Sequence, residues 1–157
     1  MISTRPYSRA PSKNSPCLAP YSCASLFSQV TLSSLNRHAV ATRGDVGTPK
    51  VLAMKNHLHQ IVPHCEIDAI NALFKKEDAE ALLAGSPMMV VDCIDNMETK
   101  VDLILHCVEH NLPVVASMGA GARIDPSRIC VGDVFHSADD PMARDVRVRL
   151  KKAGVKR

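Results

Sequence analysis

A short apolar run that passes directly into a helical pattern is the feature that most limits how this chain can fold. Residues 88–91 (MMVV) end in two β-branched valines and follow the turn-forming residues 85–87 (GSP), which is typical of a strand buried on both faces. Beyond it, apolar side chains recur at helical spacing at Val101, Ile104, Leu105, Val108 and Leu112. A buried strand followed at once by a helix indicates an α/β fold.

Two carboxylates, Asp92 and Asp95, lie where the strand stops and the helix begins. Open α/β sheets bind their ligands at the carboxyl ends of their strands. Asp95 and Glu98 also have the spacing of a capping box for a helix that begins near Asn96. On these residues alone we favour capping over ligand binding, because helices need caps far more often than sheets need metals.

The same alternation of strand and helix patterns runs through most of the chain. Further strands are predicted over residues 30–35, 65–73, 112–118 and 129–135, and helices from Thr48-Pro49 to about residue 62, over 76–83, and from Asp140-Pro141 to Gly154. Such alternation predicts a mostly parallel, doubly wound sheet.

The first 29 residues differ in composition from the rest. They are rich in Ser and Pro, and no acidic residue precedes Asp45, whereas Arg5, Arg9 and Lys13 are basic. This composition is similar to that of a mitochondrial transit peptide, and a disordered tail explains it equally well. We therefore expect a disordered or targeting segment over 1–29, a folded domain over 30–157, and a location in the mitochondrion or the cytoplasm.

Composition and cysteine spacing narrow the class of protein. A chain of 157 residues with 46% hydrophobic and 22% charged residues is expected to form about one globular domain. Its six cysteines contain no C-x-x-C pair, so neither a zinc site nor a disulfide framework is expected. No apolar run reaches the length of about 18 residues that a transmembrane helix needs.

A group of polar residues precedes the first predicted helix. Lys50 falls in its first turn, where the helix dipole disfavours a cation, so its side chain is either simply solvated or positioned to meet an anion. Asn36 and Arg37 lie upstream, and Arg and Lys both bind phosphate. A solvated basic loop is the simpler explanation. Together with Asp95, however, two cations and a carboxylate are what the activation of a nucleotide with Mg²⁺ requires.

Five stretches in order then support a family resemblance from about Val30 to Arg157. They are VTLSSLNRHAVAT, DVGTPK, VVDCIDN, SMGAGARIDPSRI and DPMARDVRVRLKKAG. This part of the chain resembles the ubiquitin-activating-type (ThiF/MoeB) ATP-binding family, and within it the tRNA threonylcarbamoyladenosine dehydratase branch. The resemblance implies a Rossmann-like, ThiF-type NAD/FAD-binding fold that uses ATP and Mg²⁺ to adenylate a carboxylate.

The resemblance also implies roles for individual residues. Asn36 would contact the nucleotide, Arg37 and Lys50 would bind its phosphates, and Asp95 would bind Mg²⁺ and phosphate, with Asp92 as a supporting carboxylate. Arg37, Lys50 and Asp95 are thus the implied catalytic residues. The ligand role of Asp95 then outweighs the capping role, although one carboxylate could serve both.

The dehydratase branch activates the threonyl carboxylate of a modified adenosine beside the tRNA anticodon, and a nitrogen of the same group then closes a ring and displaces AMP. The implied partners are tRNA carrying threonylcarbamoyladenosine and a second subunit in a homodimer. One alternative is an activator of a ubiquitin-like or sulfur-carrier protein, but neither a four-cysteine zinc site nor a nucleophilic cysteine is identifiable. The other alternative is a non-catalytic binding module.

Several departures from the family pattern predict an incomplete fold. No glycine precedes Gly44, so the glycine-rich phosphate loop is missing, and Leu26 and Ser28 occupy the region of the ribose-binding acid. The GAGA stretch after the strand at 112–118 has Ile124 in place of a third glycine and is interpreted as a turn on the substrate side. We expect a chain truncated at its N-terminus, and also soon after the last helix, with weak activity.

The last predicted helix is strongly basic. Arg144, Arg147 and Lys151 share a stripe, and Arg149 and Lys152 lie nearby. A solvated face with cations at the helix C-terminus explains them, and contact with tRNA phosphates is the alternative.

Overall fold

The computed structural model describes residues 2–4, 21–25, 28–84, 87–120 and 124–156. The strands are β1 (Ile2–Thr4), β2 (Tyr21–Ser25), β3 (Ile67–Asn71), β4 (Val90–Asp92) and β5 (Val114–Ala116), and the α-helices are α1 (Lys50–Ile61), α2 (Ala79–Leu82), α3 (Met97–Glu109) and α4 (Pro141–Lys152). Short 3-10 helices form at η1 (Leu32–Ser34), η2 (Arg43–Asp45), η3 (Lys76–Asp78) and η4 (Pro126–Arg128).

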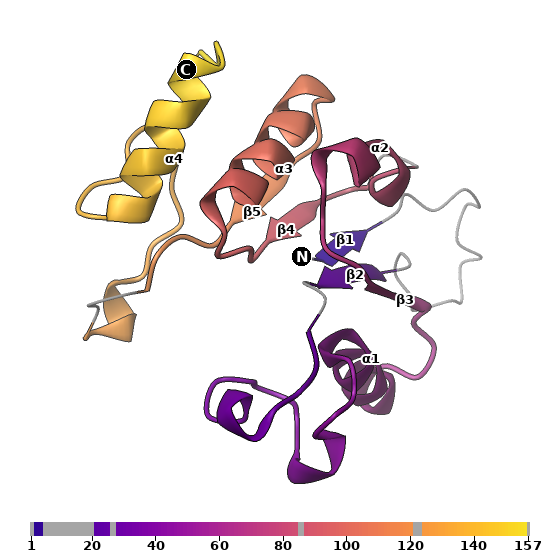
Figure 1. The fold of residues 1–157 in the computed structure, drawn as a ribbon. Coiled ribbons are helices and arrows are strands. Elements are labelled where there is room, and N and C mark those ends of the chain that lie inside the picture. Colours follow the sequence, from indigo (N-terminus) through magenta and orange to yellow (C-terminus); the bar gives the residue numbers. More distant parts are fainter. Residues whose placement is uncertain (1, 5–20, 26–27, 85–86, 121–123, 157) are drawn as a thin grey trace.

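The strands form one five-stranded sheet in the order β3-β2-β1-β4-β5. β2 pairs parallel with β3, β4 pairs parallel with β5, and β1 is antiparallel to both of its neighbours. β2, β3, β4 and β5 therefore all run in one direction and end at the same edge. Helix α1 lies on one side of the sheet and α2 and α3 on the other (Figure 1), which confirms the doubly wound α/β class.

Most predicted elements are confirmed, with shifted ends. β3, β5 and α4 lie within or close to their predicted ranges, and η3 with α2 covers the short helix predicted over 76–83. β4 begins later than predicted, at Val90, and Met88 before it is 69% exposed instead of buried. α1 has Pro49 at its N-cap position, and the Thr48 hydroxyl donates a hydrogen bond to the Asp45 carbonyl instead of capping the helix.

The strand predicted over residues 30–35 is wrong. Leu32–Ser34 forms η1, because the Ser34 side chain accepts a hydrogen bond from the Thr31 amide and donates one to the Thr31 carbonyl. Such local Ser/Thr hydrogen bonds replace the ladder bonds that a strand would need.

The strand predicted over residues 129–135 is also wrong. In the described part of the chain this segment pairs with no strand, and the side chains of Ile129 and Val131 are 81% and 91% exposed. Its last turn is closed locally, since the Phe135 amide donates to the Asp133 carboxylate at 2.7 Å. An apolar segment becomes a strand only where a partner lies beside it.

Strands β1 and β2 fall within the first 29 residues, for which the sequence predicted no regular structure. β1 takes the central position in the sheet, between β2 and β4. The predicted domain boundary at residue 30 stays a prediction.

Helix α3 contributes to both main hydrophobic clusters. Leu103 and Cys107 pack with β4 and the residues around α2 in the first cluster, whereas Val101 and Ile104 pack against α4 in the second. In Figure 1, α3 lies between α4 and α2. α3 is therefore the element that joins the basic C-terminal helix to the sheet.

Helix α4 begins and ends as the sequence predicts. Asp140 is its N-cap and accepts a hydrogen bond from the Ala143 amide at 3.1 Å, and Pro141 occupies the first turn. Gly154 follows with φ +87°, a conformation that side-chain-bearing residues rarely adopt. In the described residues, no helix has both the length and the apolar character needed to cross a membrane.

We predict that Leu103→Ala lowers the free energy of unfolding by about 2–5 kcal/mol, because Leu103 is fully buried in the first cluster. Val108→Ala is the matched control in the same helix, since Val108 is 42% exposed, and its effect should stay within about 0.5 kcal/mol. Urea unfolding followed by circular dichroism measures both. Equal losses in the two variants would contradict the assignment of Leu103 to the core.

Candidate nucleotide-binding site

The site begins with a buried ion pair at the end of β4. The Lys100 ammonium donates to Asp92 Oδ2 at 2.6 Å and to the Ser117 carbonyl at 2.8 Å, and the other Asp92 oxygen accepts from the Ile94 amide at 2.8 Å. The side chains of Asp92 and Lys100 are both 0% exposed. One cation thus ties the ends of β4 and β5 to helix α3.

Such a pair forms only where its hydrogen bonds are nearly complete, because taking two charges out of water costs several kcal/mol for each ion. Both carboxylate oxygens of Asp92 have partners within the protein. The position of Asp92 is therefore that of a support for the loop that follows, and its predicted contact with a nucleotide stays a prediction.

Lys100 was missed by sequence analysis, although a signal for it exists. It lies three residues before Leu103 and seven before Cys107, both fully buried, so it belongs to the apolar face of α3. A lysine on that face must be paired, and the nearest preceding acid at a strand end is Asp92.

Asp95 is exposed and does not cap α3. The cap is Asn96, whose side-chain oxygen accepts from the Thr99 amide and hydroxyl, each at 3.1 Å. The predicted Asp95–Glu98 capping box is therefore wrong, because the helix starts one residue later than that pattern requires. Among the described residues no hydrogen bond or ion pair involves the Asp95 carboxylate, so it is free to meet a ligand.

Lys50 is the first residue of α1, as predicted. The chain before it is held by short pairings: the Val30 amide donates to the Thr48 carbonyl, the Gly47 amide to the Val30 carbonyl, both at 2.8 Å, and the Lys50 amide to the Ser28 carbonyl at 3.1 Å. Gly47 has φ +91°, which favours glycine at this turn. The backbone that carries Lys50 is thus fixed against the segment after β2.

Asn36 and Arg37 are both exposed and lie in the turn after η1. One terminal nitrogen of Arg37 donates to the Ser33 carbonyl at 2.8 Å and to the Asn36 side-chain oxygen at 3.1 Å. A guanidinium carries five N–H donors, so donors remain for a phosphate. The structure brings Asn36 and Arg37 into direct contact, as their adjacent positions suggest.

The topology directs the two halves of the site to one edge of the sheet. Lys50, Asn36 and Arg37 follow β2, whereas Asp95 follows β4, and β2 and β4 are parallel because both are antiparallel to β1. Their ends are separated by two strand spacings, about 10 Å. After β2 the chain continues outward to β3, and after β4 it continues outward to β5, in opposite directions from β1. Open α/β sheets bind nucleotides at such a point, where the strand order reverses. No described hydrogen bond or ion pair joins Asp95 to Arg37 or Lys50.

The turn after β5 lies close to helix α4. A Cβ atom on Gly119 would come within 3.4 Å of the Asp140 carboxylate and of the Met142 side chain. Residues 121 and 122 of the GAGA turn lie outside the described residues, so the predicted contact with substrate stays a prediction.

The single carboxylate at Asp95 suits Mg²⁺ better than a metal ion whose ligands all come from the protein. Within the described residues, no three His, Cys, Asp or Glu side chains are grouped closely enough to hold a metal ion. Mg²⁺ commonly takes one or two carboxylates together with substrate phosphates and waters. One free carboxylate at Asp95 fits that requirement.

Comparison with known proteins decides the family. The ThiF family matches residues 27–151, which is most of the chain. The chain belongs to the ThiF family. This confirms the resemblance that the five sequence stretches indicate.

Individual relatives carry a more specific name. Over 131 residues the chain is 50% identical to tRNA threonylcarbamoyladenosine dehydratase 2 of Saccharomyces cerevisiae, a match that covers 82% of this chain and 29% of that protein. It is 33% identical to tRNA threonylcarbamoyladenosine dehydratase of Bacillus subtilis, over 82% of this chain and 50% of the relative. The crystal structure of the E. coli enzyme in complex with ATP matches with a TM-score of 0.78 at 30% identity, over 83% of this chain and 53% of that chain. This chain thus spans about half or less of the length of these relatives.

We predict that Lys100→Met lowers the free energy of unfolding by about 3–5 kcal/mol, because Asp92 would be left as an uncompensated buried charge. The matched control is Lys75→Met, since Lys75 forms an exposed ion pair with Glu77 at 3.6 Å, which is worth at most about 1 kcal/mol. Adding Asp92→Asn to Lys100→Met should recover part of the loss. Similar losses for Lys100→Met and Lys75→Met in urea unfolding would contradict the buried pair.

Two cysteines of the site region should differ in reactivity. Burial, and secondly the Asp92 carboxylate, raise the pKa of the Cys107 thiol to about 11, so about one molecule in a thousand carries the reactive thiolate at pH 8. Cys93, between Asp92 and Asp95, is exposed. We predict that iodoacetamide labels Cys93 in the folded protein and Cys107 only after unfolding in urea, as followed by peptide mass spectrometry. Labelling of Cys107 at the rate of Cys93 would show that α3 does not bury it.

Proposed function

We propose that this chain carries the nucleotide-binding part of a tRNA threonylcarbamoyladenosine dehydratase. The observation that carries the proposal is the pair of Asp95, a free carboxylate that directly follows β4, and Lys50, whose amide is bonded to Ser28 just after the parallel strand β2. These two strands flank a topological switch point, and Arg37 belongs to the segment between β2 and Lys50. The names of the relatives supply the substrate class, and the E. coli structure holds ATP.

The charge of each residue determines its proposed role, since the cations would bind phosphate and the carboxylate would bind the metal ion. Lys50 and Arg37 would neutralise the phosphates of ATP, Asn36 would contact the nucleotide, and Asp95 would hold Mg²⁺, which supplies further neutralisation of phosphate charge. The Lys100–Asp92 pair would keep the Asp95 loop in place. These groups act by position and charge, because transfer of a nucleotidyl group depends mainly on stabilising charge that develops on phosphate oxygens.

The reaction that this arrangement would serve has two steps. A carboxylate oxygen of the threonyl group attacks the α-phosphorus of ATP, and the bond to the β-phosphate oxygen breaks, which gives an acyl-adenylate and pyrophosphate. A nitrogen of the same modified base then attacks the acyl carbon, loses its proton and displaces AMP. The tRNA product has lost one water, whose oxygen leaves in AMP.

Two alternative functions for this chain are each supported by a specific observation. No glycine precedes Gly44, and the antiparallel strand β1 holds the centre of the sheet, which favours a weakly active or non-catalytic binding module. The exposed thiol of Cys93 beside Asp95 is the feature that an activator of a ubiquitin-like or sulfur-carrier protein could use. A homodimer, and a mitochondrial or cytoplasmic location, remain predictions.

We predict that this chain alone shows little ATP–pyrophosphate exchange, and that adding a family-type N-terminal strand and glycine loop restores exchange with tRNA carrying threonylcarbamoyladenosine. In the restored protein, Asp95→Asn should lower the rate by about 10² or more, because one preorganised charged group is lost. Asn96→Asp is the control, since aspartate caps a helix about as well as asparagine and the charge at Asp95 is untouched. Full activity of Asp95→Asn, measured by exchange of labelled pyrophosphate, would refute the ligand role.

A further inference from the structure

The exposed side of α4 carries mostly basic side chains, with Asp145 and Val148 among them. Ala143, Val146 and Leu150 are buried against the rest of the fold. Between Pro141 and Lys156 the chain has six basic residues and one acid, Asp145. The exposed ones, here called the α4 basic face, are Arg144, Arg149, Lys151, Lys152 and Lys156.

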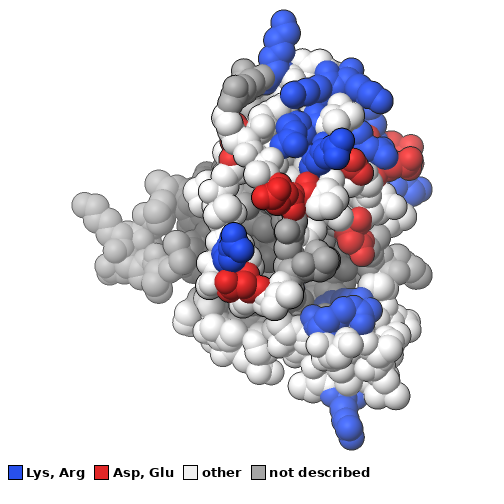
Figure 2. All heavy atoms as spheres, turned by 90° about the vertical axis from the view of Figure 1, so that its left-hand side faces the viewer, with Lys and Arg blue, Asp and Glu red and all other residues white. Residues whose placement is uncertain are grey.

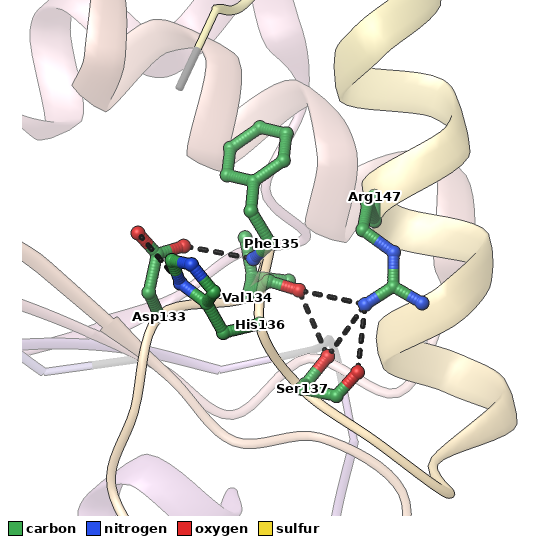
Figure 3. A network of polar contacts seen from close by, with 6 residues as sticks. All are labelled: Asp133, Val134, Phe135, His136, Ser137 and Arg147. Carbon is green, nitrogen blue, oxygen red and sulfur yellow. Dashed lines mark hydrogen bonds and ion pairs between the residues drawn. The ribbon is translucent and has the colours of Figure 1, made fainter.

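The sixth basic residue, Arg147, has a different role. One of its terminal nitrogens donates to the Val134 carbonyl at 3.0 Å, to the Ser137 carbonyl at 2.8 Å and to the Ser137 hydroxyl at 3.0 Å (Figure 3). Arg147 is only partly exposed and holds the loop before α4 against the helix. It therefore belongs to the fold, and the stripe predicted from Arg144, Arg147 and Lys151 is not a uniform solvated face.

The α4 basic face is not neutralised by the protein. No ion pair of the described residues involves any of its members, and Lys151 instead lies 6.0 Å from the centre of the Phe135 ring. The helix dipole accounts for cations in the last turn, at Arg149, Lys151 and Lys152, but it disfavours Arg144 near the first turn. The dipole thus explains three of the four members within the helix, and an external anion would explain all of them, Arg144 included.

The α4 basic face lies on the same side of the molecule as the strand ends that carry the candidate site. The N marker in Figure 1, at the start of β1 where β2 and β4 end, lies to the left of β1 and β2, and α4 lies farther to the left. Figure 2 looks onto that side and shows Lys and Arg side chains gathered in its upper part, over α4. A helix of 12 residues is about 18 Å long, enough to follow several phosphates of one strand.

A membrane surface fits this helix less well than RNA. Helices that lie in a membrane interface need an apolar face to insert. In α4 that face is used against α3, and the large apolar residue left exposed is Val148, at 45%. The α4 basic face therefore presents positive charge but no apolar side chains for insertion into a membrane. Such a surface is typical of contacts to a nucleic-acid backbone.

We propose that the α4 basic face binds the phosphate backbone of the tRNA whose modified base enters the site beside Asp95. The inference rests on the proposed function for the identity of the RNA. It adds a surface, separate from the nucleotide-binding residues, that supplies affinity independent of base sequence.

The test is filter binding of tRNA carrying threonylcarbamoyladenosine to the 157-residue chain at several KCl concentrations. Arg149→Glu with Lys152→Glu should weaken binding about tenfold or more. It should also lower the slope of log Kd against log salt by about 1.5, since each lost phosphate contact removes about 0.7–0.9. Arg149→Gln with Lys152→Gln, which avoids placing acids at the end of the helix, should show a smaller loss of the same kind.

The matched control is Lys75→Glu with Lys76→Glu, which changes the net charge equally at η3, beside α2 and on the other flank of α3 from α4. Circular dichroism should show that each variant keeps its helices. Equal weakening by the control, or unchanged binding by both α4 variants, would overturn the proposal. So would variants that lose binding to phosphatidylserine vesicles while tRNA binding persists.

A second comparison separates this proposal from the proposed function. If the α4 variants weaken tRNA binding but the restored protein shows no exchange that depends on threonylcarbamoyladenosine, the surface stands and the assigned substrate is wrong. If Asp95→Asn binds tRNA as the wild type does while the α4 variants do not, the two sets of residues act independently, as proposed.

Discussion

The arrangement at the end of the sheet depends on one ion pair that water does not reach. Lys100 reaches from α3 to Asp92 at the end of β4 and to the carbonyl of Ser117 just after β5. A second link, from the Ser117 amide to the Asp92 carbonyl at 2.7 Å, closes the same corner. Because an unpaired charge at this depth is strongly unfavourable, the three elements must keep this relation whenever the protein is folded. The loop with Asp95 and the turn with Gly119 start from this corner, so their positions follow from it.

Sequence patterns predicted the elements whose signal is periodic and failed where local bonding or a missing partner decided the structure. The runs that became α1, α3 and α4 have helical spacing over three turns or more, and the cap at Asp140 was recognisable. The 30–35 run alternates like a strand, yet Thr31 and Ser34 satisfy each other's backbone within one turn. The 129–135 run was predicted as a buried strand from its apolar residues, but pairing is a property of neighbours and cannot be read from one segment. Strands β1 (IST) and β2 (YSCAS) lie in the Ser- and Pro-rich first 29 residues and contain no run of apolar residues that would mark them as strands.

For the candidate site, too, the sequence predicted some features and missed others. The identities of Asn36, Arg37, Lys50 and Asp95 came from the order of family motifs, and the topology directs the two strands that precede them to one edge. The capping role assigned to Asp95 failed by one residue, since side-chain geometry chose Asn96. That difference has a chemical meaning, because a carboxylate that does not cap its helix keeps both oxygens for a ligand.

The two halves of the site rest on opposite sides of the sheet. α3 contributes to both described hydrophobic clusters, whereas α1, with Val51 and Ala53 buried, packs against β2 and β3 on the other side. A nucleotide that touches both Lys50 and Asp95 would couple the layers on the two sides. Part of its binding energy should then appear as slower exchange of amide hydrogens in α1 and α3 together.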